Sequence, residues 1–193
     1  IRGLIDRGTT RVLIPTAGTE QNGPHMVLGK HRFIIEHTAD LIARELGQTL
    51  VAPTMTYVPE GDIDPPSGHM RFPGTISLPN EYFVKVLEYT ARSLAVHGFT
   101  DFLFISDSGS NMRGIAEVTE ALNKEWRGSP ARVHDVSDYY ANNGIQEWLE
   151  AEGETPDAIG THAGIKDTSQ LLYVNPEHIR TEKLAYDGGF ENS

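Results

Sequence analysis

Short apolar runs that alternate with longer amphipathic segments constrain the fold of this chain more than any other feature of its sequence. Strand-like runs lie at residues 11–14, 49–52, 102–105 and 131–136. Segments with helical periodicity lie at residues 32–46, 83–94, 112–126 and 145–151, and another begins near Gly164. Apolar strands separated by helices are typical of an α/β fold with a mostly parallel sheet. Pro15 is expected to end the first strand, and Gly47 and Gly98 are expected to end helices.

The length of the chain fits one domain. A domain of 193 residues buries about 70% of the surface of its unfolded chain, enough for a sizeable core. No repeat, low-complexity run or linker interrupts the sequence, so residues 1–193 are expected to form a single domain that is trimmed at both termini. No apolar run approaches the ~20 residues needed to cross a bilayer, which argues against a membrane span.

The absence of cysteine restricts the chemistry available to the chain. It excludes disulfides, thiolate zinc sites, iron–sulfur clusters and cysteine nucleophiles, and it fits either the cytoplasm or the periplasm. The 27 Asp and Glu residues outnumber the 16 Lys and Arg residues, and the net charge of -11 argues against a nucleic-acid partner. The eight histidines and the carboxylates are left as carriers of catalysis or metal binding.

Two long segments, residues 16–30 and 53–80, fit neither strand nor helix periodicity. Both are rich in glycine, proline, histidine and acidic residues, and each follows a predicted strand. Loops at the carboxyl ends of parallel strands are where open α/β sheets bind their ligands, and ordered loops of this length are usually functional. A functional site is therefore expected where these segments meet the loops at residues 106–111 and 160–168.

The first two loops carry candidate metal ligands. Glu20, His25 and His31 lie within twelve residues, and carboxylate and imidazole groups suit zinc, manganese or a similar divalent ion. Solvated loop side chains are the alternative interpretation. In the second loop His69 is a ligand, an acid–base group or a hydrogen-bonded anchor of the loop, and its spacing favours the anchor.

The third and fourth loops carry candidate catalytic groups. Ser108 lies on a strand-to-helix turn, as in a hydrolase nucleophile elbow. That elbow has glycine two residues before and two residues after the serine, and here both positions hold serine. The backbone amides at this turn could face a substrate oxygen, and Asp107 is either a ligand or a helix cap. His162, with Asp167 five residues later, could transfer protons near neutral pH; a buried structural histidine is the alternative. The remaining histidines are interpreted as structural: His37, His97, His134 and His178.

Taken together and in this order, the four loops resemble the motifs of the creatininase (creatinine amidohydrolase) family. The resemblance spans about residues 10–175 and is carried by GTEQNGPH at residues 18–25 with His31, by His69 with FPGT at 72–75, by residues 106–111 and by residues 160–169. It implies a three-layer α/β/α fold and a metal-dependent amidohydrolase, usually a hexamer. Members of the family open a cyclic amide, remove a formyl group or cleave a modified peptide, and a small-molecule amide or lactam is the substrate expected for this chain. In the family a pair of divalent ions activates the attacking water.

The sequence departs from this family at most of the implied metal-ligand positions. Glu20 keeps its usual identity, whereas the other four positions hold Asn22, His31, Ser108 and Ser110. We therefore expect one zinc or manganese ion rather than two, held by Glu20 and His31 with Asp107 or His25.

The leading hypothesis is a hydrolase of a non-peptide or cyclic amide C–N bond. The metal would lower the pKa of a bound water, and His162, oriented by Asp167, would carry the proton to the leaving nitrogen. Ser108, Gly109 and Ser110 would stabilise the oxyanion, and Asn22 and His69 would contact the substrate. One alternative is a non-catalytic homologue that binds a small polar ligand without a metal pair. Another is a metal-free serine hydrolase that uses Ser108 and His162.

Overall fold

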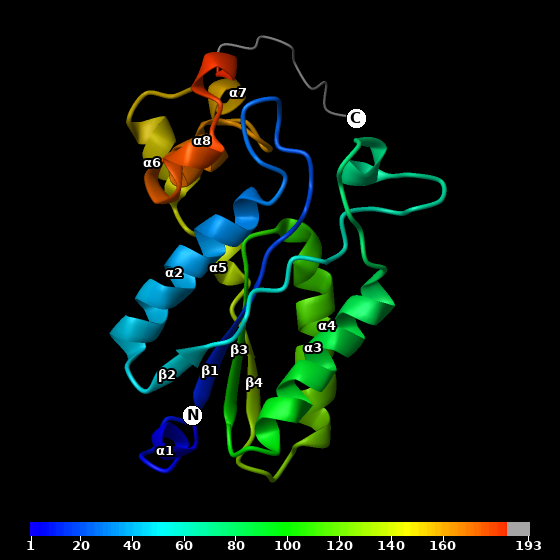
Figure 1. Ribbon diagram of the computed structural model, residues 1–193, viewed down its shortest axis with the longest axis vertical. Coiled ribbons are helices and arrows are strands. Elements are labelled where there is room, and N and C mark those ends of the chain that lie inside the picture. Colours follow the sequence, from blue (N-terminus) through cyan, green and yellow to red (C-terminus); the bar gives the residue numbers. More distant parts are fainter. Residues whose placement is uncertain (185–193) are drawn as a thin grey trace.

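A parallel β-sheet forms the centre of the computed structural model, which describes residues 1–184 (Figure 1). Within these residues the strand order is β2-β1-β3-β4, and every pairing is parallel. The strands are β1 (Arg11–Thr16), β2 (Thr49–Val51), β3 (Asp101–Ser106) and β4 (Arg132–Asp135). In the register, Val12 of β1 pairs with Leu50 of β2 and with Phe102 of β3.

Helices cover both faces of the sheet. The α-helices are α1 (Arg2–Ile5), α2 (Lys30–Leu46), α3 (Asn80–Ala95), α4 (Met112–Glu125), α5 (Asp138–Ala141), α6 (Ile145–Ala151), α7 (Pro156–Ile159) and α8 (Ile165–Val174). Short 3₁₀ helices span Gly68–Arg71, Gly109–Asn111, Pro176–His178 and Thr181–Lys183. No helix in residues 1–184 is long and apolar enough to cross a membrane.

The side-chain alternation of the central strands creates two cores. Val12 and Phe102 point to the face covered by α3 and α4, where they pack with Phe83 and Ile115. Leu13 and its neighbours point to the opposite face, where the core includes residues of α2. The predicted α/β/α layering is therefore confirmed, and the predicted strands and helices are present with boundaries shifted by a few residues.

Pro15 does not end the first strand, contrary to the expectation from the sequence. β1 continues through it to Thr16, and Pro15 pairs in register with Ile105 of β3. The carbonyls of Leu13 and Pro15 both accept hydrogen bonds from the chain on the β2 side, from Ala52 and Met55. The missing N–H of Pro15 thus faces that side, beyond the end of β2, so the proline removes no hydrogen bond from the ladder.

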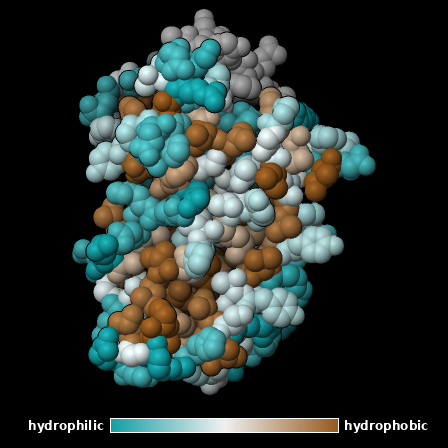
Figure 2. All heavy atoms as spheres, in the orientation of Figure 1, coloured by the Kyte–Doolittle hydropathy of each residue, from teal (hydrophilic) through white to brown (hydrophobic). Residues whose placement is uncertain are grey.

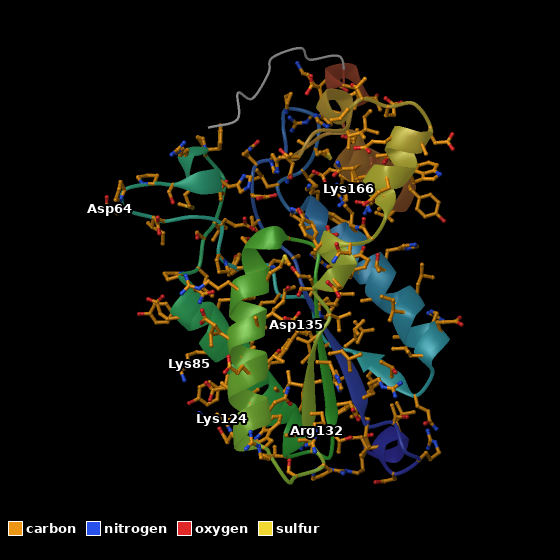
Figure 3. The ribbon with its side chains drawn as sticks, turned by 180° about the vertical axis from the view of Figure 1, so that it is seen from behind. Asp64, Lys85, Lys124, Arg132, Asp135 and Lys166 are labelled. Carbon is orange, nitrogen blue, oxygen red and sulfur yellow. The ribbon has the colours of Figure 1, made fainter. Side chains whose placement is uncertain are left out.

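Three loops gather at the carboxyl end of the sheet and prepare the site. The segment between β1 and α2 lies in the middle, with the β2–α3 loop on one side and the α6–α8 region on the other (Figure 1). From behind, Asp64 marks the tip of the β2–α3 loop and Lys166 marks α8, on opposite sides of this end (Figure 3).

Candidate functional site

A cavity of about 1150 Å³ opens between these loops at the carboxyl end of the sheet. Most of the candidate residues from the sequence line it, namely Glu20, His25, His31, His69, Ser108, Gly109, Ser110, His162 and Asp167. Two further candidates lie behind its wall: Asn22 is fully buried and Asp107 nearly so. The predicted convergence of the four loops is therefore observed.

Glu20 lies at the centre of this site, and three histidines surround its carboxylate. Oε1 of Glu20 is 2.7 Å from His31 Nε2 and 3.6 Å from His162 Nδ1, while Oε2 is 3.1 Å from His69 Nε2. Burial alone would raise the pKa of Glu20, but the hydrogen bond and charge of His31, together with the other two histidines, lower it to about 2. Glu20 is therefore ionised at every physiological pH.

His31 is buried between two carboxylates. Its Nε2 donates to Glu20, and its Nδ1 donates to Asp107 Oδ2 at 2.9 Å. Burial and the nearby Lys30 disfavour the charged ring, yet the two carboxylates outweigh them, and the pKa of His31 is raised. Because both ring nitrogens are donors, His31 offers no lone pair to a metal. This arrangement differs from the expectation that His31 and Asp107 ligate an ion.

His69 and His162 have a geometry that suits metal ligands. The Nε2–H of His162 donates to the carbonyl of Gln21 at 2.6 Å, which leaves the Nδ1 lone pair directed toward Glu20. Burial lowers the pKa of His162, so its ring is neutral at pH 7. The rings of His69 and His162 lie 4.5 Å apart. Among residues 1–184, Glu20, His69 and His162 form the group of ligand atoms, all within 4.8 Å of one another, that could hold a metal ion.

Asp167 positions the chain after His162 rather than the imidazole itself. Its Oδ2 accepts a hydrogen bond from the backbone N–H of Ala163 at 2.8 Å and lies 2.5 Å from Nζ of Lys30. Burial would raise the pKa of Asp167, but the charge of Lys30 lowers it. Ala163 has φ 55, a left-handed conformation that is strained for alanine, and the Asp167 hydrogen bond helps to hold it.

The other predicted residues stabilise the loops around the site. The amide of Asn22 donates to the carbonyls of Glu20, Val27 and Leu28, which closes the first loop. The hydroxyls of Ser108 and Ser110 are hydrogen-bonded to each other at 2.9 Å.

His25 lies apart from the Glu20 cluster. Its Nε2 bonds to the hydroxyl of Thr168 at 2.9 Å. Burial and the charge of Lys30 lower the pKa of His25, so this ring is neutral at pH 7.

The sequence analysis missed two buried ionisable residues of the site, Lys30 and Glu60. Lys30 is 1% exposed and is the first residue of α2. A cation is unfavourable at the N-terminus of a helix, and this unusual position was the feature of the sequence that could have identified Lys30 as a residue of the site. Glu60 is 2% exposed, and burial, followed by the negative charge of Glu20, raises its pKa to about 10. A single glutamate in a long acidic loop gives no comparable signal.

Comparisons with known proteins place this geometry in context. The family model for creatininase, described as creatinine amidohydrolase, matches residues 1–191. The chain is 28% identical over 178 residues to the mycofactocin precursor peptide peptidase of Mycolicibacterium smegmatis (strain ATCC 700084 / mc(2)155), covering 90% of this chain and 61% of that protein. It is 24% identical over 175 residues to the 3-dehydro-scyllo-inosose hydrolase of Thermotoga maritima, covering 89% of this chain and 52% of that protein. The chain thus spans only about half to three fifths of the length of these relatives.

Solved structures give the same fold. A crystal structure of creatinine amidohydrolase (creatininase) superposes with a TM-score of 0.76 at 22% identity, covering 94% of this chain and 71% of that one. A structure named "Creatininase Mn" superposes with a TM-score of 0.75 at 23% identity, covering 92% of this chain and 70% of that one.

Proposed function

The chain belongs to the creatininase (creatinine amidohydrolase) family, and from that premise we propose that it is a metal-dependent hydrolase of an amide C–N bond. The observation that carries this proposal is the cluster of Glu20, His69 and His162 inside the cavity. Two relatives, one named as a peptide peptidase and one as an inosose hydrolase, support the assignment of hydrolase activity. We propose a small non-peptide amide or a lactam as the substrate, with a modified peptide as the competing class.

The donor set of this cluster fits one divalent ion such as zinc or manganese. It offers one carboxylate and two imidazoles, and the hydrogen bond from His162 to Gln21 fixes the tautomer that ligation requires. In a catalytic site such an ion would still accept substrate or water, either at an open position or by expansion of its coordination. When bound, such an ion supplies Lewis acidity, which lowers the pKa of a water and polarises a carbonyl.

The pair of ions that the family resemblance implies does not fit these residues. His31 donates from both ring nitrogens, and the Asn22 amide donates to backbone carbonyls. The hydroxyls of Ser108 and Ser110 bond to each other. One ion per chain is therefore the proposed stoichiometry.

The residues of the chain itself would bind and orient the substrate. Gly109 and Ser110 line the cavity in the 3₁₀ turn that leads into α4, and their backbone N–H groups belong to the first residues of that turn. They are the proposed donors to the oxyanion, a contribution of about 3 kcal/mol for one donor. His31 and Asp107 hold the Glu20 carboxylate in place through the buried hydrogen bonds described above.

The remaining functional hypotheses have different support. A non-catalytic ligand-binding protein is favoured by one observation: the imidazolium of His31 already pairs with both Glu20 and Asp107. A serine hydrolase has less support, because the hydroxyl of Ser108 bonds to Ser110 and no hydrogen bond within residues 1–184 joins it to His162.

A hydrolysis screen tests the proposed function. Purified protein would be assayed on lactams, cyclic and acyclic small amides, and peptides, before and after metal removal by EDTA and after addition of Mn²⁺ or Zn²⁺. We expect hydrolysis that EDTA abolishes and metal restores, and that Glu20→Gln removes. The control is His134→Ala, which alters a half-exposed histidine paired with Asp101 on β4 and β3. Activity that survives both EDTA and Glu20→Gln would contradict the proposal.

A homo-oligomer is also proposed, on the basis of the family resemblance. Support comes from hydrophobic side chains that gather around the edge strand β2 (Figure 2), where Leu46 is 46% and Val51 is 39% exposed.

A further inference from the structure

Glu60 is the buried ionisable residue of the site that the arrangement above leaves unexplained. The backbone holds it firmly: its N–H donates to the hydroxyl of Ser77 at 3.0 Å, and its carbonyl accepts from the N–H of His69 at 3.0 Å. The second of these bonds ties Glu60 directly to the residue that carries one of the candidate metal ligands. Its side chain is 2% exposed and lines the cavity.

The site leaves space for this carboxylate at Gly18. A Cβ built on Gly18 would overlap Oε1 of Glu60, so the carboxylate packs against the bare Cα of the segment that leads to Glu20. The φ of Gly18 does not require glycine, and the close approach is therefore the reason that a side chain is excluded.

Neither carboxyl oxygen of Glu60 makes a well-formed hydrogen bond within residues 1–184, although the Glu20 carboxylate and the Ser110 hydroxyl lie close to it. The other buried charged groups nearby are all paired: Glu20 and Asp107 with His31, and Lys30 with Asp167. A buried acid whose oxygens lack partners points to a ligand that belongs between it and its neighbours. Among the charged groups around Glu60, the Glu20 carboxylate acts on it most strongly, and two neighbouring carboxylates in a cavity form a typical cation site.

We propose that Glu60 is a fourth protein ligand of the ion that Glu20, His69 and His162 hold. This inference rests on the proposed function, because it extends the same metal centre. Two carboxylates and two neutral imidazoles would give a donor set whose charge balances that of a divalent cation. The alternative is that Glu60 is an uncharged structural acid that packs under Gly18 and never contacts the ion.

Metal titration of the metal-free protein separates these two roles. Mn²⁺ binding would be measured by isothermal titration calorimetry, and by loss of the free-Mn²⁺ signal in electron paramagnetic resonance, for the wild type, Glu60→Gln and Gly18→Ala. Since loss of a group that merely supports a ligand already weakens binding by about 10–100-fold, we expect Glu60→Gln to weaken it by at least about 100-fold. Gly18→Ala, which displaces the carboxylate without altering it, should also weaken binding. The matched control is Glu120→Gln, on the exposed side of α4, with unchanged affinity.

Thermal melting distinguishes a loss of metal affinity from a loss of folding stability in the variant. In EDTA, Glu60→Gln should melt at or above the wild-type midpoint, because the amide keeps the shape of the side chain and removes an unpaired acid. Addition of Mn²⁺ should raise the melting temperature of the wild type by more than that of the variant. Wild-type affinity in a well-folded Glu60→Gln would overturn this inference and leave the proposed function standing. Absence of Mn²⁺ and Zn²⁺ binding by the wild type would overturn the proposed function itself.

Discussion

At the scale of single residues, the site is an alternation of buried charges. Asp107, His31 and Glu20 form a chain of carboxylate, imidazole and carboxylate, and Lys30 with Asp167 forms a second pair beside it. Buried charges are tolerated when each has a partner. Removal of one member should therefore lower the free energy of unfolding by more than the loss of its own contacts, because the charge of its partner stays buried and unpaired.

His31→Asn should destabilise the metal-free protein in a pH-dependent way. The pKa of His31 is raised in the folded state, so its stabilising charge is fully present below its ordinary pKa of 6.5 and is lost as the pH rises through the folded-state pKa. We expect a loss of about 3–5 kcal/mol in the free energy of unfolding at pH 5.5, and a smaller loss at pH 9. Urea unfolding in EDTA at several pH values measures this difference. A difference that grows with pH would contradict the assigned charge of His31.

Lys30 and Asp167 should behave as a coupled pair. Lys30→Met leaves a buried carboxylate without its cation and is expected to cost about 3–5 kcal/mol in the free energy of unfolding. Asp167→Asn in the Lys30→Met background should recover part of that loss. A double-mutant cycle by urea unfolding checks this, and additive effects of the two changes would show that the pair is not coupled.

At the scale of secondary-structure elements, the sequence predicted the buried strands and amphipathic helices because their periodicity reports burial directly. It was wrong at Pro15, since the hydrogen-bonding side of a strand residue depends on neighbours that periodicity does not specify. Likewise, the four loops were correctly expected to meet, but the hydrogen-bond partners of the side chains within them were not predicted. Whether His31 faces a metal or two carboxylates depends on distances of a few ångströms between segments far apart in the chain. Glu60 was missed for the same reason.

The close packing of α3 on α4 gives a prediction at this scale. A Cβ at Gly114 of α4 would lie 2.6 Å from Cδ1 of Phe83 in α3. Gly114→Ala should therefore destabilise the protein by about 1–3 kcal/mol through overpacking, although alanine favours helix. The matched control is Gly3→Ala in α1, where the nearest atom is Arg7 Nη1 at 3.4 Å. Thermal melting of both variants tests this, and a stabilised Gly114→Ala would contradict it.

At the scale of the whole molecule, one end of the sheet carries the site, and the edge strand β2 lies in an apolar surface. β2 pairs with β1, and no described strand pairs with its other edge. Exposed apolar residues lie near that edge, where Figure 2 shows a hydrophobic area. An open apolar edge favours association, so the site and the association surface would be separate features of the fold.

We expect the chain to be a homo-oligomer in solution, and Val51→Lys on β2 to weaken the assembly, since a charge at an edge strand opposes pairing. Light scattering coupled to size-exclusion chromatography measures the mass of each form. Tyr89→Lys on α3 is the control, because Tyr89 is 63% exposed on a helix away from this edge. A monomeric wild type, or a Val51→Lys variant with unchanged mass, would contradict this expectation.

Glu20 is proposed to organise a single metal ion in the cavity at the carboxyl end of the sheet. The most direct measurement is the metal content per chain, by inductively coupled plasma mass spectrometry, of wild-type and Glu20→Gln protein purified without chelators or a histidine tag. We expect close to one zinc or manganese ion per wild-type chain and almost none in Glu20→Gln. Wild-type protein without metal, or equal metal content in both proteins, would contradict it.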